Sequence, residues 1–111
     1  GRVGDGAVDI RPGSPTFGQY HAEELSGESG VLLWIPAGFA HGFCVLGDEP
    51  ADMLYKVDNL YSRAGEGGIR FDDKELNIPW PVKNSIISDR DKELLSWRDY
   101  CQTPPKWSVA A

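Results

Sequence analysis

One histidine stands in a sequence context that favours chemistry. His41 lies in the segment Trp-Ile-Pro-Ala-Gly-Phe-Ala-His-Gly-Phe, between two short apolar runs. Pro36 and Gly38 predict a tight turn just before it, so His41 falls where a strand begins and where an imidazole can point into a barrel. Such a side chain can hydrogen-bond a substrate, move a proton or ligate a metal ion. A lone histidine after a turn is more often structural, so a functional role needs other residues beside it.

A tyrosine is the second candidate. Residues 51–60 are predicted to form a strand, and alternation along it places Tyr55 on the same face as Met53 and Val57. Both neighbours are core-type side chains, so the phenol is expected to face inward. From the residues alone, a core tyrosine with a satisfied hydroxyl is the simpler interpretation.

The elements that would position these side chains are mostly short strands. Strands are expected at 7–11, 17–25, 31–35, 40–46 and 51–60, with turns at 12–15, 26–30 and 47–50 and a short strand at 69–71. Ser88 is expected to cap a short helix that runs to about Trp97. This pattern predicts an all-β protein, an antiparallel barrel or jelly roll with a short C-terminal helix. We expect one domain over residues 1–100 and a C-terminal tail over 101–111.

Composition limits the function classes. The chain has 111 residues with 41% hydrophobic residues, enough for one small core, and a formal net charge of -6. Its lysines and arginines form no cluster or stripe, so no nucleic-acid partner is expected. The longest apolar runs are too short for a membrane span and no signal peptide is recognisable. Cys44 and Cys101 have no metal-ligand spacing, which is typical of reduced thiols in a cytoplasmic protein.

Several blocks of the sequence resemble one family in order and register. They are residues 7–18, 33–43, 54–56 and 69–73 with 79–81, and the second block, with Gly30 ahead of it, contains the Gly-x5-Pro-x-Gly-x2-His motif of the cupin superfamily. Together they are similar to dTDP-4-dehydrorhamnose 3,5-epimerase, from Gly1 to about Asp91. The resemblance implies a cupin-type jelly roll that is incomplete, because the family's N-terminal strands precede the region matched by Gly1.

The resemblance also implies a reaction. The family acts on a dTDP-4-keto-6-deoxysugar in L-rhamnose biosynthesis, without metal or organic cofactor. The ketone acidifies the neighbouring C–H groups, so a base removes a proton, an enolate forms, and an acid returns the proton on the opposite face. Family members are dimers built by strand exchange, which implies a homodimer formed by strand pairing.

The family's site residues carry over one at a time. Tyr55 matches the proton donor and Asp91 matches the aspartate that orients the base. The expected substrate-binding residues are Tyr61, which matches the tyrosine that stacks on thymine, and His41, Glu66, Arg90 and Asp5. An exposed aspartate at a helix start and a tyrosine in a loop are the simpler interpretations of Asp91 and Tyr61.

The family's histidine base lies upstream of the region matched by Gly1, and His21 falls in a stretch that the family does not use for catalysis. General-base catalysis is worth on the order of 10²- to 10⁴-fold, so the chain alone is expected to be a weak or inactive epimerase. Two alternatives remain open. One is a non-catalytic dTDP-sugar-binding or assembly module, and the other is a metal-dependent cupin, for which only His41 is a suitably placed ligand.

Overall fold

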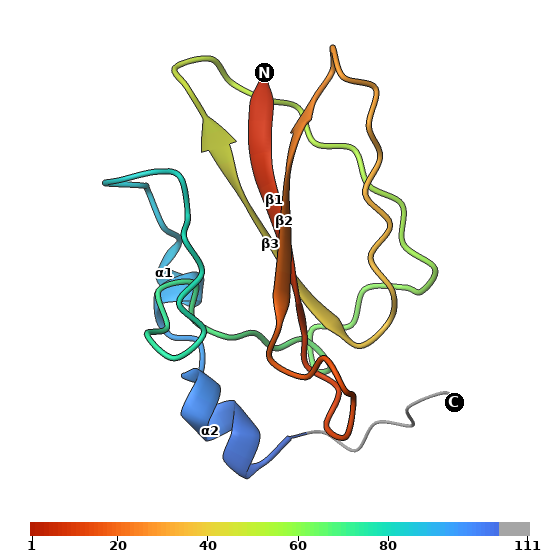
Figure 1. Ribbon diagram of the computed structural model, residues 1–111, viewed down its shortest axis with the longest axis vertical. Helices are drawn as coiled ribbons and strands as arrows, with labels where there is room; N and C mark the ends of the chain where they lie inside the picture. The colour runs from red at the N-terminus through yellow and green to blue at the C-terminus, as the bar shows by residue number, and fades with distance from the viewer. Residues whose placement is uncertain (105–111) are drawn as a thin grey trace.

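A three-stranded antiparallel sheet is the centre of the protein. The computed structural model describes residues 1–104. Its elements are β1 (Arg2–Asp9), β2 (Tyr20–Ser26), β3 (Phe39–Leu46), α1 (Asp89–Lys92) and α2 (Trp97–Gln102). The strand order is β2-β1-β3, so the first strand of the chain is the middle strand of the sheet (Figure 1). Val3, Ala7 and Val8 of β1 are buried, which agrees with the central position of this strand.

Three of the predicted strands are confirmed with shifted ends. The strand expected at 7–11 begins earlier, at Arg2, while those expected at 17–25 and 40–46 become β2 and β3. The antiparallel arrangement is confirmed by the registers of both strand pairs. The fold prediction is therefore confirmed as an antiparallel sheet with short helices.

The strands predicted at 31–35 and 51–60 are wrong for this structure. Both segments are without strand or helix, and Leu32 and Leu54 are 93% and 91% exposed. Apolar alternation indicates which side chains would suit a sheet, but a strand also needs a neighbour for its N–H and C=O groups. Within residues 1–104, neither segment belongs to the hydrogen-bonded sheet. The turn at 47–50 accordingly does not close a hairpin.

Two helices replace the single one expected. Ser88 caps α1 as predicted, and its hydroxyl accepts a hydrogen bond from the Asp91 N–H. The helix ends at Lys92 in a tight turn, in which the Glu93 N–H donates to the Arg90 carbonyl. Further on, the Leu95 carbonyl accepts from the N–H of Arg70 at 2.8 Å. Ser96 then caps α2, which continues to Gln102 and so passes the domain end expected at residue 100. The rest of the predicted tail, from residue 105, lies outside the described residues.

The two faces of the sheet have different neighbours. Figure 1 views the sheet edge-on, with the extended segments 27–36 and 51–60 on one side and residues 70–88 with α1 on the other. On the second side, which we call the back face, the Trp80 ring covers Gly42, where an added Cβ would lie 3.3 Å from the ring. The Trp80 indole N–H donates to the Phe71 carbonyl, which fixes the ring. The other side, the front face, carries His41.

A buried ion pair fixes the start of β3. Asp9 is 1% exposed and accepts hydrogen bonds from Arg11, Ser14 and Thr16. The Arg11 guanidinium also lies over the Phe39 ring, 4.9 Å from its centroid. This network therefore links the end of β1, the following turn and the first residue of the strand that carries His41.

We expect Gly38→Ala to lower the free energy of unfolding by about 2–4 kcal/mol. Gly38 has φ +89°, and an added Cβ would lie 2.5 Å from Cγ of Arg11, which Asp9 holds in place. Gly13→Ala is the matched control, because Gly13 has φ +86° with no atom within 4 Å of an added Cβ. Urea unfolding of both variants separates backbone strain from the clash. Equal losses of unfolding free energy in the two variants would show that the contact with Arg11 adds no destabilisation.

Among residues 1–104, neither helix could serve as a transmembrane span.

Candidate functional site

The front face brings four polar residues of the three strands together. Ala7 on β1 lies directly opposite His41 on β3 and His21 on β2. Asp5, two residues earlier on β1, lies opposite Glu23 of β2. Directly opposite residues of an antiparallel pair point to the same side, so these five side chains share one face.

His41 and Asp5 form the first contact group. The Nε2 atom of His41 lies 2.7 Å from Oδ1 of Asp5, with side-chain exposures of 32% and 4%. A carboxylate in its ionised form can only accept a hydrogen bond, and with such a carboxylate the imidazole donates from Nε2. The structure thus brings together two residues that the sequence placed in the substrate site.

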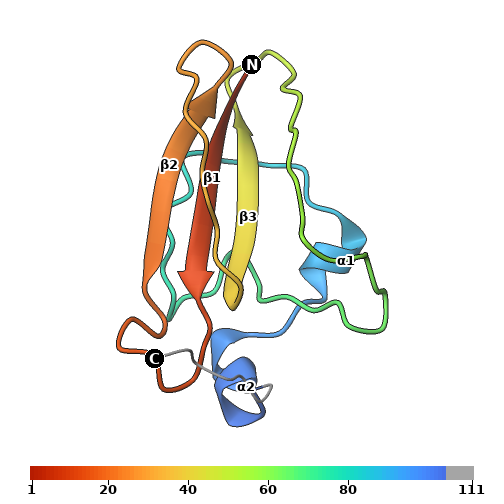
Figure 2. The ribbon, with the colours of Figure 1, turned by 90° about the vertical axis from the view of Figure 1, so that its right-hand side faces the viewer.

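Tyr61, Glu66 and Arg90 form a second contact group. The Tyr61 hydroxyl donates to Oε2 of Glu66 at 2.6 Å, and the Arg90 guanidinium pairs with Oε1 of the same carboxylate. The hydrogen bond from Tyr61 and the pairing with Arg90 lower the pKa of Glu66, while the pKa of Tyr61 is raised mainly by its bond to Glu66. Figure 2 places α1, which carries Arg90, beyond the β3 edge of the sheet.

We expect Glu66→Gln to lower the pKa of the Tyr61 phenol toward its ordinary value of about 10. The substitution removes the carboxylate that stabilises the neutral phenol. NMR titration of the tyrosine Cζ signals measures the change. Glu24→Gln, on the back face of β2, is the control and should leave the Tyr61 titration where it is. An unchanged Tyr61 pKa in Glu66→Gln would contradict the assignment of this hydrogen bond.

The two residues predicted to be catalytic, Tyr55 and Asp91, take no part in the side-chain contacts of these two groups. Tyr55 is 67% exposed on the extended segment 51–60, so the expectation that it packs inward with Met53 and Val57 is wrong for this structure. Asp91 is exposed in the first turn of α1, next to Arg90. Their catalytic roles stay predictions.

Sequence reasoning missed the pair formed by His21 and Glu23. The Nε2 atom of His21 lies 2.9 Å from Oε1 of Glu23 on the same strand. The i, i+2 spacing in a predicted strand was the available signal, since such residues share a face. What the sequence did not provide was the register that sets this pair beside Asp5.

Among residues 1–104, no three His, Cys, Asp or Glu side chains are arranged to hold a metal ion.

Comparison with known proteins shows the family. The dTDP-4-dehydrorhamnose 3,5-epimerase family model matches residues 1–99. An epimerase of this name from Shigella flexneri is 56% identical over 91 residues, which are 82% of this chain and 50% of the relative. The Pseudomonas aeruginosa enzyme is 46% identical over 100 residues, or 89% of this chain and 55% of the relative. The chain thus spans about half the length of these relatives.

Solved structures agree. A dTDP-4-dehydrorhamnose 3,5-epimerase from Elizabethkingia anophelis superposes with a TM-score of 0.81 at 39% identity, covering 89% of this chain and 55% of that one. A dTDP-6-deoxy-D-glucose-3,5-epimerase from Legionella pneumophila, solved with dTDP-4-keto-L-rhamnose, gives 0.79 at 35% identity, covering 98% and 58%. The family model over residues 1–99 and these relatives therefore place this chain in the dTDP-4-dehydrorhamnose 3,5-epimerase family.

Proposed function

We propose that this chain supplies the sugar-nucleotide site of a dTDP-4-dehydrorhamnose 3,5-epimerase. The observation that carries the proposal is the hydrogen bond between Asp5 and His41 on the front face of the sheet. A buried carboxylate that orients an imidazole gives a fixed polar group with one ring nitrogen left to contact a ligand. The known complex of the Legionella pneumophila relative with a dTDP-4-keto sugar supports this ligand class.

The proposed arrangement assigns one part of the ligand to each contact group. Tyr61 stacks on the thymine. Arg90 leaves its ion pair with Glu66 and binds the diphosphate instead. His41, held by Asp5, hydrogen-bonds the sugar. Arginine suits this role because its planar guanidinium binds phosphate oxygens in a bidentate manner.

The proposed reaction is proton transfer next to the C4 ketone. A base takes the proton from C3 or C5, the electron pair moves onto the ketone oxygen as an enolate, and Tyr55 returns a proton to the opposite face of the same carbon. Asp91 orients the base. The family's base histidine precedes the matched region, so we propose that the chain alone epimerises weakly or not at all.

We further propose that the front face is completed in an assembly of the cupin jelly-roll type, with a homodimer formed by strand pairing. The extended segments 31–36 and 51–60 support this proposal. They carry exposed apolar side chains, including Leu32, Trp34, Leu54 and Val57, and lie along the front face (Figure 2). Pairing with added strands would satisfy their backbone groups and cover these side chains.

Titration calorimetry with dTDP, followed by NMR of dTDP-4-keto-6-deoxyglucose with the chain in deuterated water, tests the function. We expect dTDP to bind and to shift the Tyr61 signals, with little deuterium uptake at C3 and C5. Uptake that appears when the N-terminal part of a longer relative is added supports the epimerase. Binding without uptake even then would support the alternative of a non-catalytic sugar-nucleotide module. No binding of dTDP would reject both.

A further inference from the structure

Two carboxylates lie side by side on the front face. Asp5 on β1 is directly opposite Glu23 on β2. Like charges at opposite positions of an antiparallel pair are destabilising, because the Cβ atoms are only about 5 Å apart. Each carboxylate has its own imidazole: Asp5 meets His41 at 2.7 Å, and Glu23 meets His21 at 2.9 Å. The face therefore carries two imidazole–carboxylate pairs.

The two imidazoles flank one small residue. Ala7 is opposite His21 on one side and His41 on the other. Neighbouring strands are about 4.8 Å apart, so the two histidine Cα atoms are separated by about 9–10 Å. With hydrogen bonds of about 2.8 Å from both sides, this separation matches the width of one pyranose ring. Between the two histidines, Ala7 carries only a methyl group and is 8% exposed.

Both imidazoles use the same ring nitrogen for their carboxylate. Nε2 of His21 contacts Glu23 and Nε2 of His41 contacts Asp5. When the carboxylates are ionised they accept from Nε2–H, so Nδ1 is the atom left for a ligand in each ring. A sugar offers hydroxyl groups on opposite edges, and these can donate to two such nitrogens.

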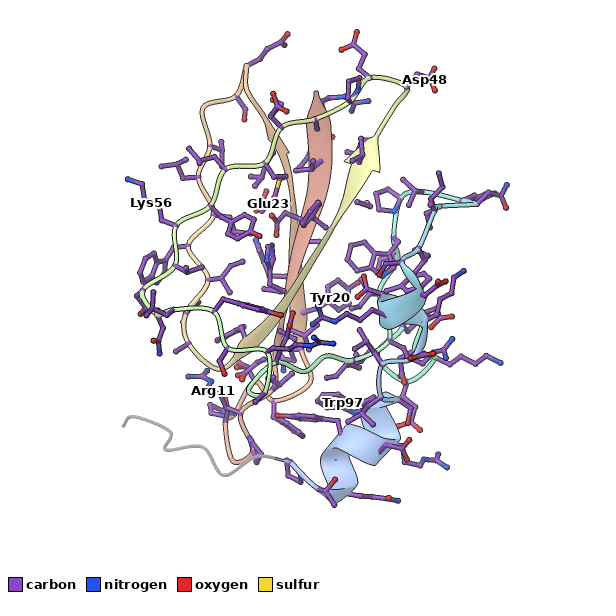
Figure 3. The ribbon with its side chains drawn as sticks, turned by 180° about the vertical axis from the view of Figure 1, so that it is seen from behind. Arg11, Tyr20, Glu23, Asp48, Lys56 and Trp97 are labelled. Atoms are coloured by element: carbon purple, nitrogen blue, oxygen red, sulfur yellow. The ribbon has the colours of Figure 1, made fainter. Side chains whose placement is uncertain are left out.

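His21 and Glu23 could instead be an ordinary exposed pair, since their side chains are 65% and 46% exposed and such pairs add little stability. Arg2 and Glu24 on the back face are an example. The pair of His21 and Glu23 differs from that pair in the face of the sheet on which it lies. Figure 3 shows Glu23 on the side of the sheet that faces the extended segment carrying Lys56, which is the side that Asp5 and His41 share.

We infer that His21, oriented by Glu23, is a sugar-contacting residue that closes the sugar position on the side away from His41. The inference rests on the proposed function. In that function, His41 on β3 contacts the sugar. The next residue across the front face is Ala7 on β1, and beyond it lies His21 on β2.

The test compares two ligands on the same chain. Titration calorimetry gives the dissociation constants of dTDP alone and of dTDP-4-keto-6-deoxyglucose, and their ratio reports the contribution of the sugar. We expect His21→Phe to reduce this ratio by about 3- to 10-fold while dTDP binds as before, the loss of one hydrogen bond. His21→Gln should restore part of it. Glu23→Gln should act in the same direction, and Glu24→Gln, on the opposite face of β2, should have no effect.

The outcomes separate this inference from the proposed function. A reduced sugar contribution with unchanged dTDP binding supports His21 as a sugar contact. An unchanged sugar contribution in His21→Phe, with dTDP still bound, overturns the inference and leaves the proposed function standing. A parent chain that binds neither ligand overturns both. Equal weakening of both ligands in His21→Phe would show a structural effect and also overturn the inference.

Discussion

Asp9→Asn is expected to lower the free energy of unfolding by about 3 kcal/mol, the scale of breaking a buried ion pair by removing one partner. Asp9 accepts from the Arg11 backbone N–H and guanidinium and from the Ser14 and Thr16 hydroxyls. An asparagine amide presents N–H groups where one carboxylate oxygen now accepts, so at least one donor loses its partner. Chemical unfolding near pH 7 measures the loss.

The same residue predicts a pH dependence. Hydrogen bonds from Arg11 hold the pKa of Asp9 well below its usual range, against the opposing effect of burial. The unfolded carboxyl has a pKa of about 3.9, so the stabilisation is fully present above that pH and is lost as pH falls through the lower folded-state pKa. We expect the parent to lose stability below about pH 5 more steeply than Asp9→Asn does.

Asp72→Asn is the control for this experiment. Asp72 also pairs with an arginine, Arg70, but its side chain is 47% exposed, so its removal should cost no more than about 1 kcal/mol. If Asp9→Asn were no more destabilising than Asp72→Asn, the Asp9 network would not be what holds the start of β3.

Tyr55→Phe should reduce turnover by about 10²- to 10⁴-fold in an enzyme assembled with the segment that the longer relatives carry. The proposed role of Tyr55 depends on its hydroxyl, and phenylalanine keeps the ring. The Tyr55 side chain is exposed in this chain, so loss of its hydroxyl should leave dTDP affinity unchanged. Deuterium incorporation at C3 and C5, followed by NMR, measures the step directly.

Tyr20→Phe provides the matched control, because Tyr20 is paired with Val8 and so points to the back face of the sheet. Its activity should equal that of the parent. Turnover in Tyr55→Phe that equals the Tyr20→Phe value would show that another group returns the proton.

Local sequence patterns predicted the turns and the helix cap, because these depend on a few neighbouring residues. The turn at Pro36 and Gly38 sets the start of β3 and the position of His41, and Ser88 caps a helix as expected. The strands at 31–35 and 51–60 failed because apolar alternation does not supply a hydrogen-bonding neighbour. A pattern of side chains can indicate a strand only where another strand is available to it.

In the candidate site too, some groupings could be predicted from the sequence and one depends on strand pairing. The resemblance placed Asp5 and His41 in one site, and their contact agrees with that grouping. Glu66, in a loop without regular structure, lies between Tyr61 and Arg90. The His21 pair depends on the register of β1 against β2, which no local signal fixes.

The peptide groups of Ile10 have a consequence for how the chain is made. The Ile10 N–H donates to the Gly38 carbonyl, and its own carbonyl accepts at 2.6 Å from the hydroxyl of Tyr100, a residue 90 positions later. Contacts so distant in sequence close only after most loop-closure entropy has been lost. During synthesis at the ribosome, the sheet can therefore form well before α2 docks, and the Ile10 carbonyl gains this partner only after Tyr100 has left the exit tunnel.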